Sequence, residues 1–450
     1  MHSVTMYSKQ IKGHSHVFKE TVAVYRAVVD YLINVCMDHW AKITLIPGRL
    51  DRQRCVESLV HVTKYNPSVP YSDFDVRFYK LPSYLRRSAI MEAIGKVSSY
   101  MSHMQIWENT DRSSRGAQPG FPRAGFVFPC MYNGNMYEAE GQYSVRLKVY
   151  IHNTWDWITI PVRKSDADYI AHHCRSMKES APTLRKRGKL WYLDFAYETK
   201  VEFCETPVEE QTILAVDLGI NNACTCSAMK ADGTVIGRHF LSLPKENDCL
   251  NRRLARIKNA QRGGAKHMPR LWGAVKGIND RIAVLTAQFI IDTAVLYNTD
   301  VIVMEHLDTS DKKHGSKKQR LHFWCAQYVQ AMVTGKAHRL GMRVSTVCAW
   351  GTSRLAFDGS GPVLRGKQSE KTDSNYSLCE FSSGKVYHCD LNATYNIGAR
   401  YFVRAITKSL SATARQLLEA KVPSAVKRST CTLSTLISLN AVLSASAAAS

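Results

Sequence analysis

The sequence predicts an α+β protein of several domains, in which a helical region, a β-rich region and an α/β region follow one another. Apolar residues recur at helical spacing over 18–37 and 83–103, and they alternate with polar residues over 143–151. Further along, two apolar strands, 213–216 and 301–304, each run directly into an acidic residue. A chain of 450 residues is long enough for two or three such domains.

The chain carries a large excess of basic residues. There are 60 Lys and Arg against 38 Asp and Glu, which gives a formal net charge of +22. A folded protein with this surplus repels itself unless it meets a polyanion. We therefore expect a nucleic acid as partner. A membrane surface is the second choice, and a charge that serves only solubility is the minority interpretation.

The N-terminus, the apolar runs and the cysteines together indicate the expected cellular location. The sequence has no apolar run of 18 residues, and its N-terminus, MHSVTMYSKQIKGHSH, has no apolar core. We therefore expect no membrane association and a cytoplasmic location. The 13 cysteines are odd in number and scattered. Without a secretion signal they are expected to be buried hydrophobes rather than a disulfide framework.

The β-rich region contains a strongly basic turn. It lies between the predicted strands 157–162 and 189–197 and carries Arg185, Lys186 and Arg187. A basic turn of this kind suits a nucleic-acid backbone. A solvated hairpin tip remains the alternative for each of these side chains.

The α/β region begins with three predicted strands. The first, 213–216, ends in Asp217, and strands over 224–229 and 235–241 follow, joined by a tight turn at Asp232-Gly233. Such a strand-turn-strand start is typical of a ribonuclease H-like sheet. Further strands and helices are predicted at 278–297 (helix), 301–304 (strand), 322–340 (helix) and 343–348 (strand).

Three acidic residues stand at the ends of these elements. Asp217 and Glu305 follow apolar strands, and Asp390 opens a helix. Parallel strands deliver their ends to one edge of a sheet, where three carboxylates would repel one another unless cations neutralised them. Mg²⁺ prefers oxygen ligands, and two such ions about 4 Å apart can activate water for phosphodiester cleavage. The pattern predicts a two-metal nuclease site at Asp217, Glu305 and Asp390.

The segments around these acids resemble the three RuvC segments of TnpB and the type V CRISPR effectors. They read AVDLGINN at 215–222, VMEHL at 303–307 and DLNATYNI at 390–397. Two segments upstream, 79–82 and 182–192, resemble the same family. The match covers most of residues 70 to 405, and it is strong in the RuvC segments and softer before them.

The resemblance implies an RNA-guided DNA endonuclease in which Asp217, Glu305 and Asp390 are the catalytic, metal-binding acids. It implies Mg²⁺, with Mn²⁺ as a substitute, and a guide RNA and double-stranded target DNA as partners in a prokaryotic cell. Two alternatives stay open: a guided DNA-binding protein with little or no cleavage, and a transposase-associated DNA-binding protein. Whether the protein is transposon-encoded or CRISPR-associated also stays open. We expect a monomer, with a homodimer as the alternative.

The resemblance also divides the chain. The tail is rich in Ser and Ala, and its last seven residues, 444–450, are expected to be disordered or weakly helical. The expected parts are the start of a wedge β-barrel (1–17), a helical recognition domain (18–115), the second part of the wedge β-barrel (116–205), RuvC segments I and II with basic helices (206–348), a target-strand-loading module (349–386), RuvC segment III (387–408) and the tail (409–450).

The loading module departs from the family pattern. In TnpB, two CxxC pairs bind zinc between the second and third RuvC segments. Here residues 352–361 contain no cysteine, and Cys379 and Cys389 are not CxxC-spaced. We expect no structural zinc but a module held by packing. Arg354 is the candidate for a phosphate contact in it, with an ordinary surface arginine as the alternative.

Two basic runs flank the catalytic segments. Arg252, Arg253 and Arg256 belong to the first, and Lys312 and Lys313 to the second. We expect both runs to contact nucleic-acid backbones. Solvated helix faces are the alternative, since most charge runs are that.

Overall fold

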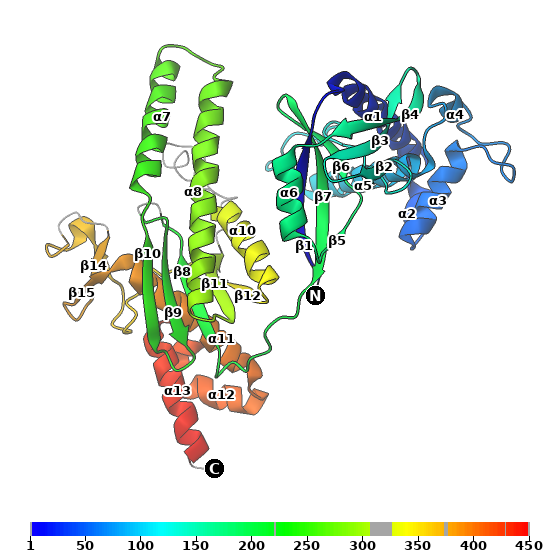
Figure 1. The fold of residues 1–450 in the computed structure, drawn as a ribbon. Helices are drawn as coiled ribbons and strands as arrows, with labels where there is room; N and C mark the ends of the chain where they lie inside the picture. The colour runs from blue at the N-terminus through cyan, green and yellow to red at the C-terminus, as the bar shows by residue number, and fades with distance from the viewer. Residues whose placement is uncertain (1, 220–221, 307–325, 373–376, 428, 449–450) are drawn as a thin grey trace. The chain divides into compact units, whose positions relative to one another are not determined.

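The computed structural model describes residues 2–219, 222–306, 326–372, 377–427 and 429–448. The chain divides into two compact units (Figure 1). One is Val4–Thr199, and the other is Lys200–Ser450 together with the first three residues.

The helices of the first unit are α1 (Ser15–Asp38), α2 (Trp40–Thr44), α3 (Arg49–Val60), α4 (Asp73–Arg77), α5 (Ser83–Asn109) and α6 (Lys164–His173). The helices predicted over 18–37 and 83–103 are confirmed as α1 and α5. Helix α1 buries one apolar stripe, including Tyr25, Val29 and Leu32, and it packs against α5. A stripe that repeats every three to four residues can face a partner only as a helix.

The strands of the first unit form two sheets. One has the order β1 (His2–Ile11), β7 (Leu190–Lys200), β5 (Lys178–Glu179), with β6 (Thr183–Arg187) also paired to β7, and the other joins β2 (Tyr137–Glu140), β3 (Ser144–Ile151) and β4 (Thr154–Pro161). Within the described residues neither sheet closes into a barrel, so the expected wedge β-barrel is wrong. A single bridge, Ile11 to Val162, pairs the end of β1 with the residue after β4, where a barrel needs a continuous ladder.

The second unit is built on a five-stranded sheet with the order β10-β9-β8-β11-β12. Its strands are β8 (Thr212–Asp217), β9 (Cys224–Lys230), β10 (Val235–Leu241), β11 (Val301–His306) and β12 (Arg343–Cys348). Strands β8, β11 and β12 are parallel, whereas β9 and β10 run antiparallel to their neighbours. The predicted strands of this region are confirmed.

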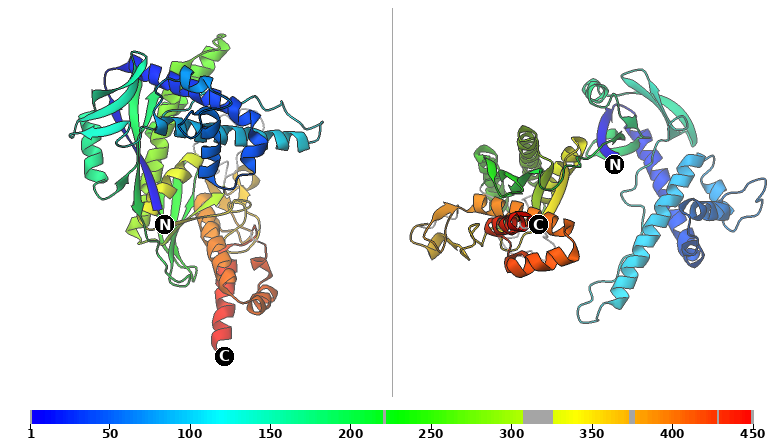
Figure 2. Two further views of the ribbon diagram at one scale, coloured as in Figure 1. Left: turned by 90° about the vertical axis from the view of Figure 1, so that its right-hand side faces the viewer. Right: turned by 90° about the horizontal axis from the view of Figure 1, so that it is seen from below.

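Helices cover both faces of this sheet (Figures 1 and 2). They are α8 (Pro269–Leu296) and α10 (Ala326–Arg339) on one face and α11 (Cys389–Ser409) on the other, whereas α7 (Pro244–Arg262) packs against α8. Alternate residues of β8 serve the two faces: Leu214 and Val216 pack with α8 and α10, whereas Ile213 and Ala215 pack with α11. Helix α11 lies so close to the sheet that a Cβ at Gly398 would meet the Met229 sulfur at 2.4 Å. This close contact fixes the helix over the strand ends.

The remaining chain forms a small sheet and a helical end. The elements are β13 (Leu364–Arg365), η1 (Gly366–Gln368), β14 (Leu378–Glu380), β15 (Val386–His388), α12 (Ala412–Lys421), η2 (Pro423–Ala425) and α13 (Leu433–Ala448). The predicted Ser- and Ala-rich end, 444–450, is helical as far as Ala448, the last described residue. Earlier in the tail, Leu418, Leu436 and Leu439 pack into the core beside α11. Within the described ranges no helix is long and apolar enough to span a membrane.

Candidate active site

Two of the predicted acids lie side by side at the carboxyl edge of the second unit's sheet. Asp217 is the last residue of β8, and Glu305 is the fifth residue of β11. The two strands are parallel, with Met304 opposite Val216. The next residue on each strand is therefore one of the acids, and successive residues point to the same face as their cross-strand neighbours. Parallel pairing brings Asp217 and Glu305 together.

The third acid reaches this edge from a helix. Asp390 is the second residue of α11, which packs on β8 and β11. Asn222, just after the turn that follows β8, donates from Nδ2 to the Asp390 carboxylate at 3.0 Å. His388 caps the helix, because its Nδ1 accepts the backbone N–H of Asp390 at 3.2 Å. His388 thus has a structural role that also holds Asp390 at the first turn.

The electrostatics show that the three carboxylates affect one another. Burial raises the pKa of Asp217 well above its usual value, and the neighbouring charges of Glu305 and Asp390 raise it further. Burial also raises the pKa of Glu305, against a hydrogen bond from Thr352 and the charge of Arg400. Mutual repulsion of this kind is what a bound cation relieves.

The donor set suits a hard divalent cation, since all three candidate ligands supply carboxylate oxygens. The side chains as placed do not yet enclose an ion: in the described part of the chain, no group of three His, Cys, Asp or Glu residues is positioned to hold a metal. All three acids are partly exposed. Their carboxylates therefore have room to change rotamer toward an ion.

Two residues at this edge, Thr352 and Arg365, were not predicted from the sequence. Thr352 donates its hydroxyl to the Glu305 carboxylate. Arg365 lies close enough to Asp217 for its charge to oppose the rise in the pKa of that acid. Its Nη2 donates to the Ser353 carbonyl at 2.5 Å, and its buried Nε has no partner among the described residues. Both lie in a Gly- and Ser-rich stretch, where neither periodicity nor spacing marks a functional side chain.

Arg354, the arginine selected from the sequence, is exposed on the loop between β12 and β13. Its described hydrogen bonds are those of its backbone: its N–H donates to the Gly351 carbonyl, and its carbonyl accepts the Val363 N–H. Arg365, eleven positions later, therefore interacts with the acids more strongly than Arg354 does.

The module around β13 to β15 has its own small hydrophobic core. Cys379 and Cys389 pack there with Ala356, Val363 and Phe381. The thiols of the two cysteines also interact: the contact with Cys389 lowers the pKa of Cys379, and the reverse contact raises that of Cys389. Packing of this kind holds the module together without involving the three acids.

Arg185, Lys186 and Arg187, predicted in a turn, are instead the last three residues of strand β6, where they pair with β7, and a buried acid of β7 holds two of them. Arg187 donates to Asp194 at 2.6 Å and Arg185 lies 3.5 Å from the same carboxylate, which is 2% exposed. Lys186 lies over the Trp191 ring, 5.7 Å from its centroid. Part of the charge of this strand end is thus neutralised within the fold, whereas no acidic side chain in the described part of the chain forms an ion pair with Lys186.

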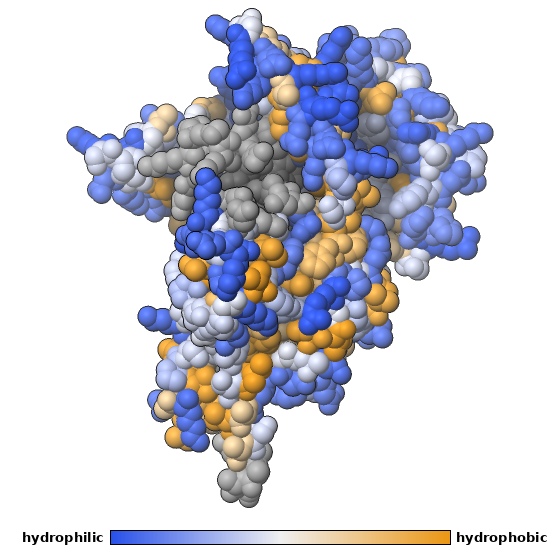
Figure 3. Space-filling model, turned by 90° about the vertical axis from the view of Figure 1, so that its left-hand side faces the viewer, coloured by the Kyte–Doolittle hydropathy of each residue, from blue (hydrophilic) through white to orange (hydrophobic). Residues whose placement is uncertain are grey.

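The predicted basic helix is α7. Arg252 and Arg256 are exposed on it, and Arg253 is partly buried. Helices α7 and α8 form a hairpin that projects beyond the sheet (Figure 1), and hydrophilic side chains cover its far end at the top of Figure 3. Lys312 and Lys313 lie outside the described residues.

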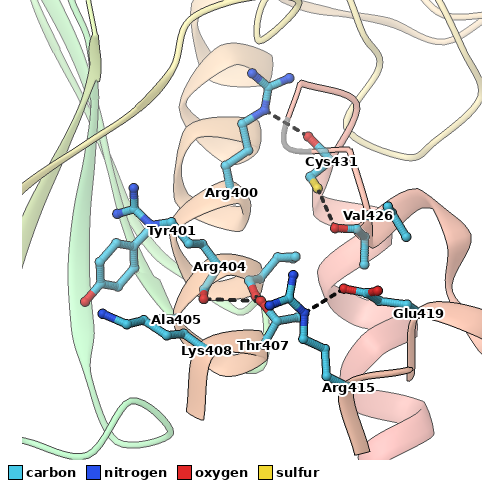
Figure 4. A pocket seen from close by; sticks show the side chains of 12 residues that line it. Arg400, Tyr401, Arg404, Ala405, Thr407, Lys408, Arg415, Glu419, Val426 and Cys431 are labelled. Atoms are coloured by element: carbon cyan, nitrogen blue, oxygen red, sulfur yellow. Dashed lines mark hydrogen bonds and ion pairs between the residues drawn. The ribbon is translucent and has the colours of Figure 1, made fainter. Parts of the chain in front are cut away.

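A cleft of about 620 Å³ lies apart from the acids, between α11, α12 and the segment after η2 (Figure 4). Basic side chains dominate it, including Arg404, Lys408 and Arg415, and Arg415 is paired with Glu419 at 2.8 Å. None of the three predicted acids lines it.

Comparison with known proteins places the fold. A model of the Aq_aa04 family matches residues 3–151, and a search of curated proteins finds no match. The structure is similar to CasPhi-2 (Cas12j) bound to crRNA and phosphorothioate DNA, with 11% identity, a TM-score of 0.51, and coverage of 89% of this chain and 91% of that one. The mini RNA-guided endonuclease CRISPR-Cas_phi3 matches at 11% identity with a TM-score of 0.49, covering 88% and 92%. A Cas12f1–sgRNA–target DNA complex matches at 12% with a TM-score of 0.33, covering 88% and 98%. At 11% identity the likeness to CasPhi-2 is one of fold.

Proposed function

We propose that this chain is an RNA-guided DNA endonuclease that cleaves phosphodiester bonds at a RuvC-type site. The observation that carries the proposal is the meeting of Asp217, Glu305 and Asp390 at one sheet edge, close enough for their charges to interact. A fold similar to that of CasPhi-2, whose structure holds crRNA and DNA, supports it. The net charge of +22 supports a polyanionic partner.

The residues divide the work at this edge. Asp217, Glu305 and Asp390 would hold Mg²⁺ or Mn²⁺, which supplies an acidified water and a Lewis acid for the leaving oxygen. The positive charge of Arg365 acts on Asp217 at the same edge, and its guanidinium would contact a non-bridging oxygen of the scissile phosphate. Asn222 keeps Asp390 in place through its 3.0 Å hydrogen bond.

The partners in this proposal are a guide RNA and double-stranded target DNA. Exposed cations on α7, including Arg252 and Arg256, would contact the nucleic-acid backbone. Lys186 on strand β6 would do the same in the first unit. Base pairing between guide RNA and target DNA recognises the DNA sequence. The protein contacts therefore need to recognise only the shape and the charge of the nucleic-acid backbone.

A second function, guided DNA binding with little or no cleavage, rests on one observation. No group of three metal-ligating side chains among the described residues is positioned to hold an ion. If the carboxylates cannot close on a cation when the substrate is bound, the protein would bind DNA and leave it intact.

The proposal predicts that the purified protein carries a discrete RNA and cuts DNA matched to it only with a divalent metal. Sequencing of the co-purified RNA identifies the guide, and a plasmid carrying its complement beside a randomised flanking region is the substrate. Cleavage with Mg²⁺ that stops with EDTA, and that is absent on an unmatched plasmid, is the expected result. Binding of the matched plasmid without any nick in Mg²⁺ or Mn²⁺ would support the second function. A protein free of RNA would contradict both.

We also predict that Arg365→Ala slows guided cleavage about 10- to 100-fold, because a buried charge-assisted contact to the phosphate contributes roughly 1.5–3 kcal/mol. Single-turnover cleavage with saturating protein measures the effect, and DNA affinity should change little. Arg354→Ala is the matched control on the same module, and it should change the rate less than about threefold. Equal effects of the two substitutions on the cleavage rate would contradict a contact between Arg365 and the scissile phosphate.

A further inference from the structure

The loop that follows β12 is held by side chains from α11. Asn392 donates to the Leu355 carbonyl at 2.8 Å and accepts the Phe357 N–H at 2.8 Å. Asn396 donates to the carbonyls of Thr352 at 2.9 Å and Leu355 at 2.8 Å. The two asparagines are fully buried and four residues apart, so they share one face of the helix. Their amides fix the backbone of residues 352–357.

Arg400, one helical turn further on, extends this hold in two directions. Its Nη1 donates to the carbonyls of Cys348 at 2.6 Å and Trp350 at 2.8 Å. Its Nε donates to Cys431 at 3.1 Å (Figure 4), and its Nη2 donates to Ser429 at 2.6 Å. Arg400 is only 4% exposed. It therefore ties two separate segments to α11: the chain from the end of β12 to the start of the loop, and the segment 429–431.

Thr352, which lies in this tightly held loop, contacts the candidate metal ligand Glu305. Thr352 is 2% exposed, its carbonyl is held by Asn396, and its hydroxyl donates to the Glu305 carboxylate. The same hydroxyl lies 3.0 Å from the Ala349 carbonyl. A hydroxyl has one hydrogen to donate, and the charged carboxylate is the stronger acceptor. Thr352 therefore fixes one oxygen of Glu305, and among the described residues no hydrogen bond holds the other.

We propose that Thr352 is a positioning residue that orients the Glu305 carboxylate for a divalent cation, with Asn396 and Arg400 holding Thr352 in place. This inference rests on the proposed function, because it assumes that Glu305 is a metal ligand. Groups that orient a metal ligand in this way commonly change metal affinity 10- to 100-fold when they are lost.

The test compares Thr352→Val, which keeps the shape and loses the hydroxyl, with Thr352→Ser, which keeps the hydroxyl. Mn²⁺ binding to the full chain, followed by electron paramagnetic resonance of the free ion, is the first measurement. The valine variant should bind Mn²⁺ about tenfold more weakly, and the serine variant should bind it nearly as wild type does. The metal concentration for half-maximal cleavage should shift in the same order.

The matched control is Thr293→Val on α8. Thr293 is 5% exposed, and its hydroxyl donates to the Phe289 carbonyl at 2.8 Å, away from the acids. It should leave Mn²⁺ affinity unchanged. Thermal unfolding of each variant shows whether it is folded, and the serine variant keeps the test open if the valine variant is not.

The outcomes separate this inference from the proposed function. If wild type binds Mn²⁺ but cuts no guided DNA, the proposed function fails, while the Mn²⁺ affinities still decide the role of Thr352. The inference is overturned if valine at 352 leaves Mn²⁺ affinity unchanged, if serine weakens it as much as valine does, or if wild type binds no Mn²⁺.

Discussion

Asp217→Asn should abolish guided cleavage, by at least about a thousandfold, while binding of guide RNA and target DNA persists. The substitution removes one charged metal ligand, and the metal contributes several kcal/mol to stabilising the transition state. Asparagine keeps the shape of the side chain, so the strand end should not move. Single-turnover cleavage measures the loss, and a gel-shift assay in Mg²⁺ measures the binding.

The same variant should be more stable than wild type when metal is absent. Burial and the charges of Glu305 and Asp390 raise the pKa of Asp217. An acid whose pKa is higher in the folded state destabilises that state when ionised, and it regains stability as pH falls through the folded pKa. Asparagine carries no charge at any pH. Thermal unfolding in EDTA at neutral pH should therefore give a higher melting temperature for Asp217→Asn, with the gap closing as pH is lowered.

Glu419→Gln is the control for this prediction. Glu419 lies in the cleft beside α12 and pairs with the exposed Arg415 at 2.8 Å. Its loss should alter neither cleavage nor metal-free stability by more than a small amount, because exposed ion pairs contribute little. Full activity of Asp217→Asn would rule out the carboxylate mechanism.

Arg400→Met should destabilise the second unit by about 3 kcal/mol or more. It leaves four buried or partly buried carbonyls, those of Cys348, Trp350, Ser429 and Cys431, without their donor. An acceptor left unsatisfied costs about 1–3 kcal/mol, and methionine returns only part of this through packing. For a unit of this size the loss corresponds to a fall of about 10 °C in melting temperature.

Arg415→Met serves as the matched control, because the two arginines line the same cleft (Figure 4). The Arg415 side chain is 56% exposed and pairs only with Glu419 in the described structure. Its loss should change stability by less than about 1 kcal/mol. Differential scanning calorimetry resolves the transition of the second unit, and similar effects of the two substitutions would contradict the assigned role of Arg400.

Local pattern was sufficient for most individual elements. Helices α1 and α5 and strands β8 to β12 follow from periodicity, because a stripe of apolar residues can be buried in one way only. The β-barrel did not follow, since closure depends on pairing between strands far apart in the chain. The packing of residues 409–448 did not follow either, because Leu418, Leu436 and Leu439 stand among Ser and Ala residues and find their partner in α11.

By itself the sequence determined the places of Asp217 and Glu305, because a carboxylate that directly follows a buried strand must lie at the edge of a sheet, and it placed Asp390 at the start of a helix. Only the tertiary structure decided which residues support them. Thr352 reaches Glu305, and Arg365 reaches Asp217, across 47 and 148 positions of the chain. Contacts over such separations depend on how α11 and the loop after β12 pack. No local pattern of a threonine or an arginine encodes that packing.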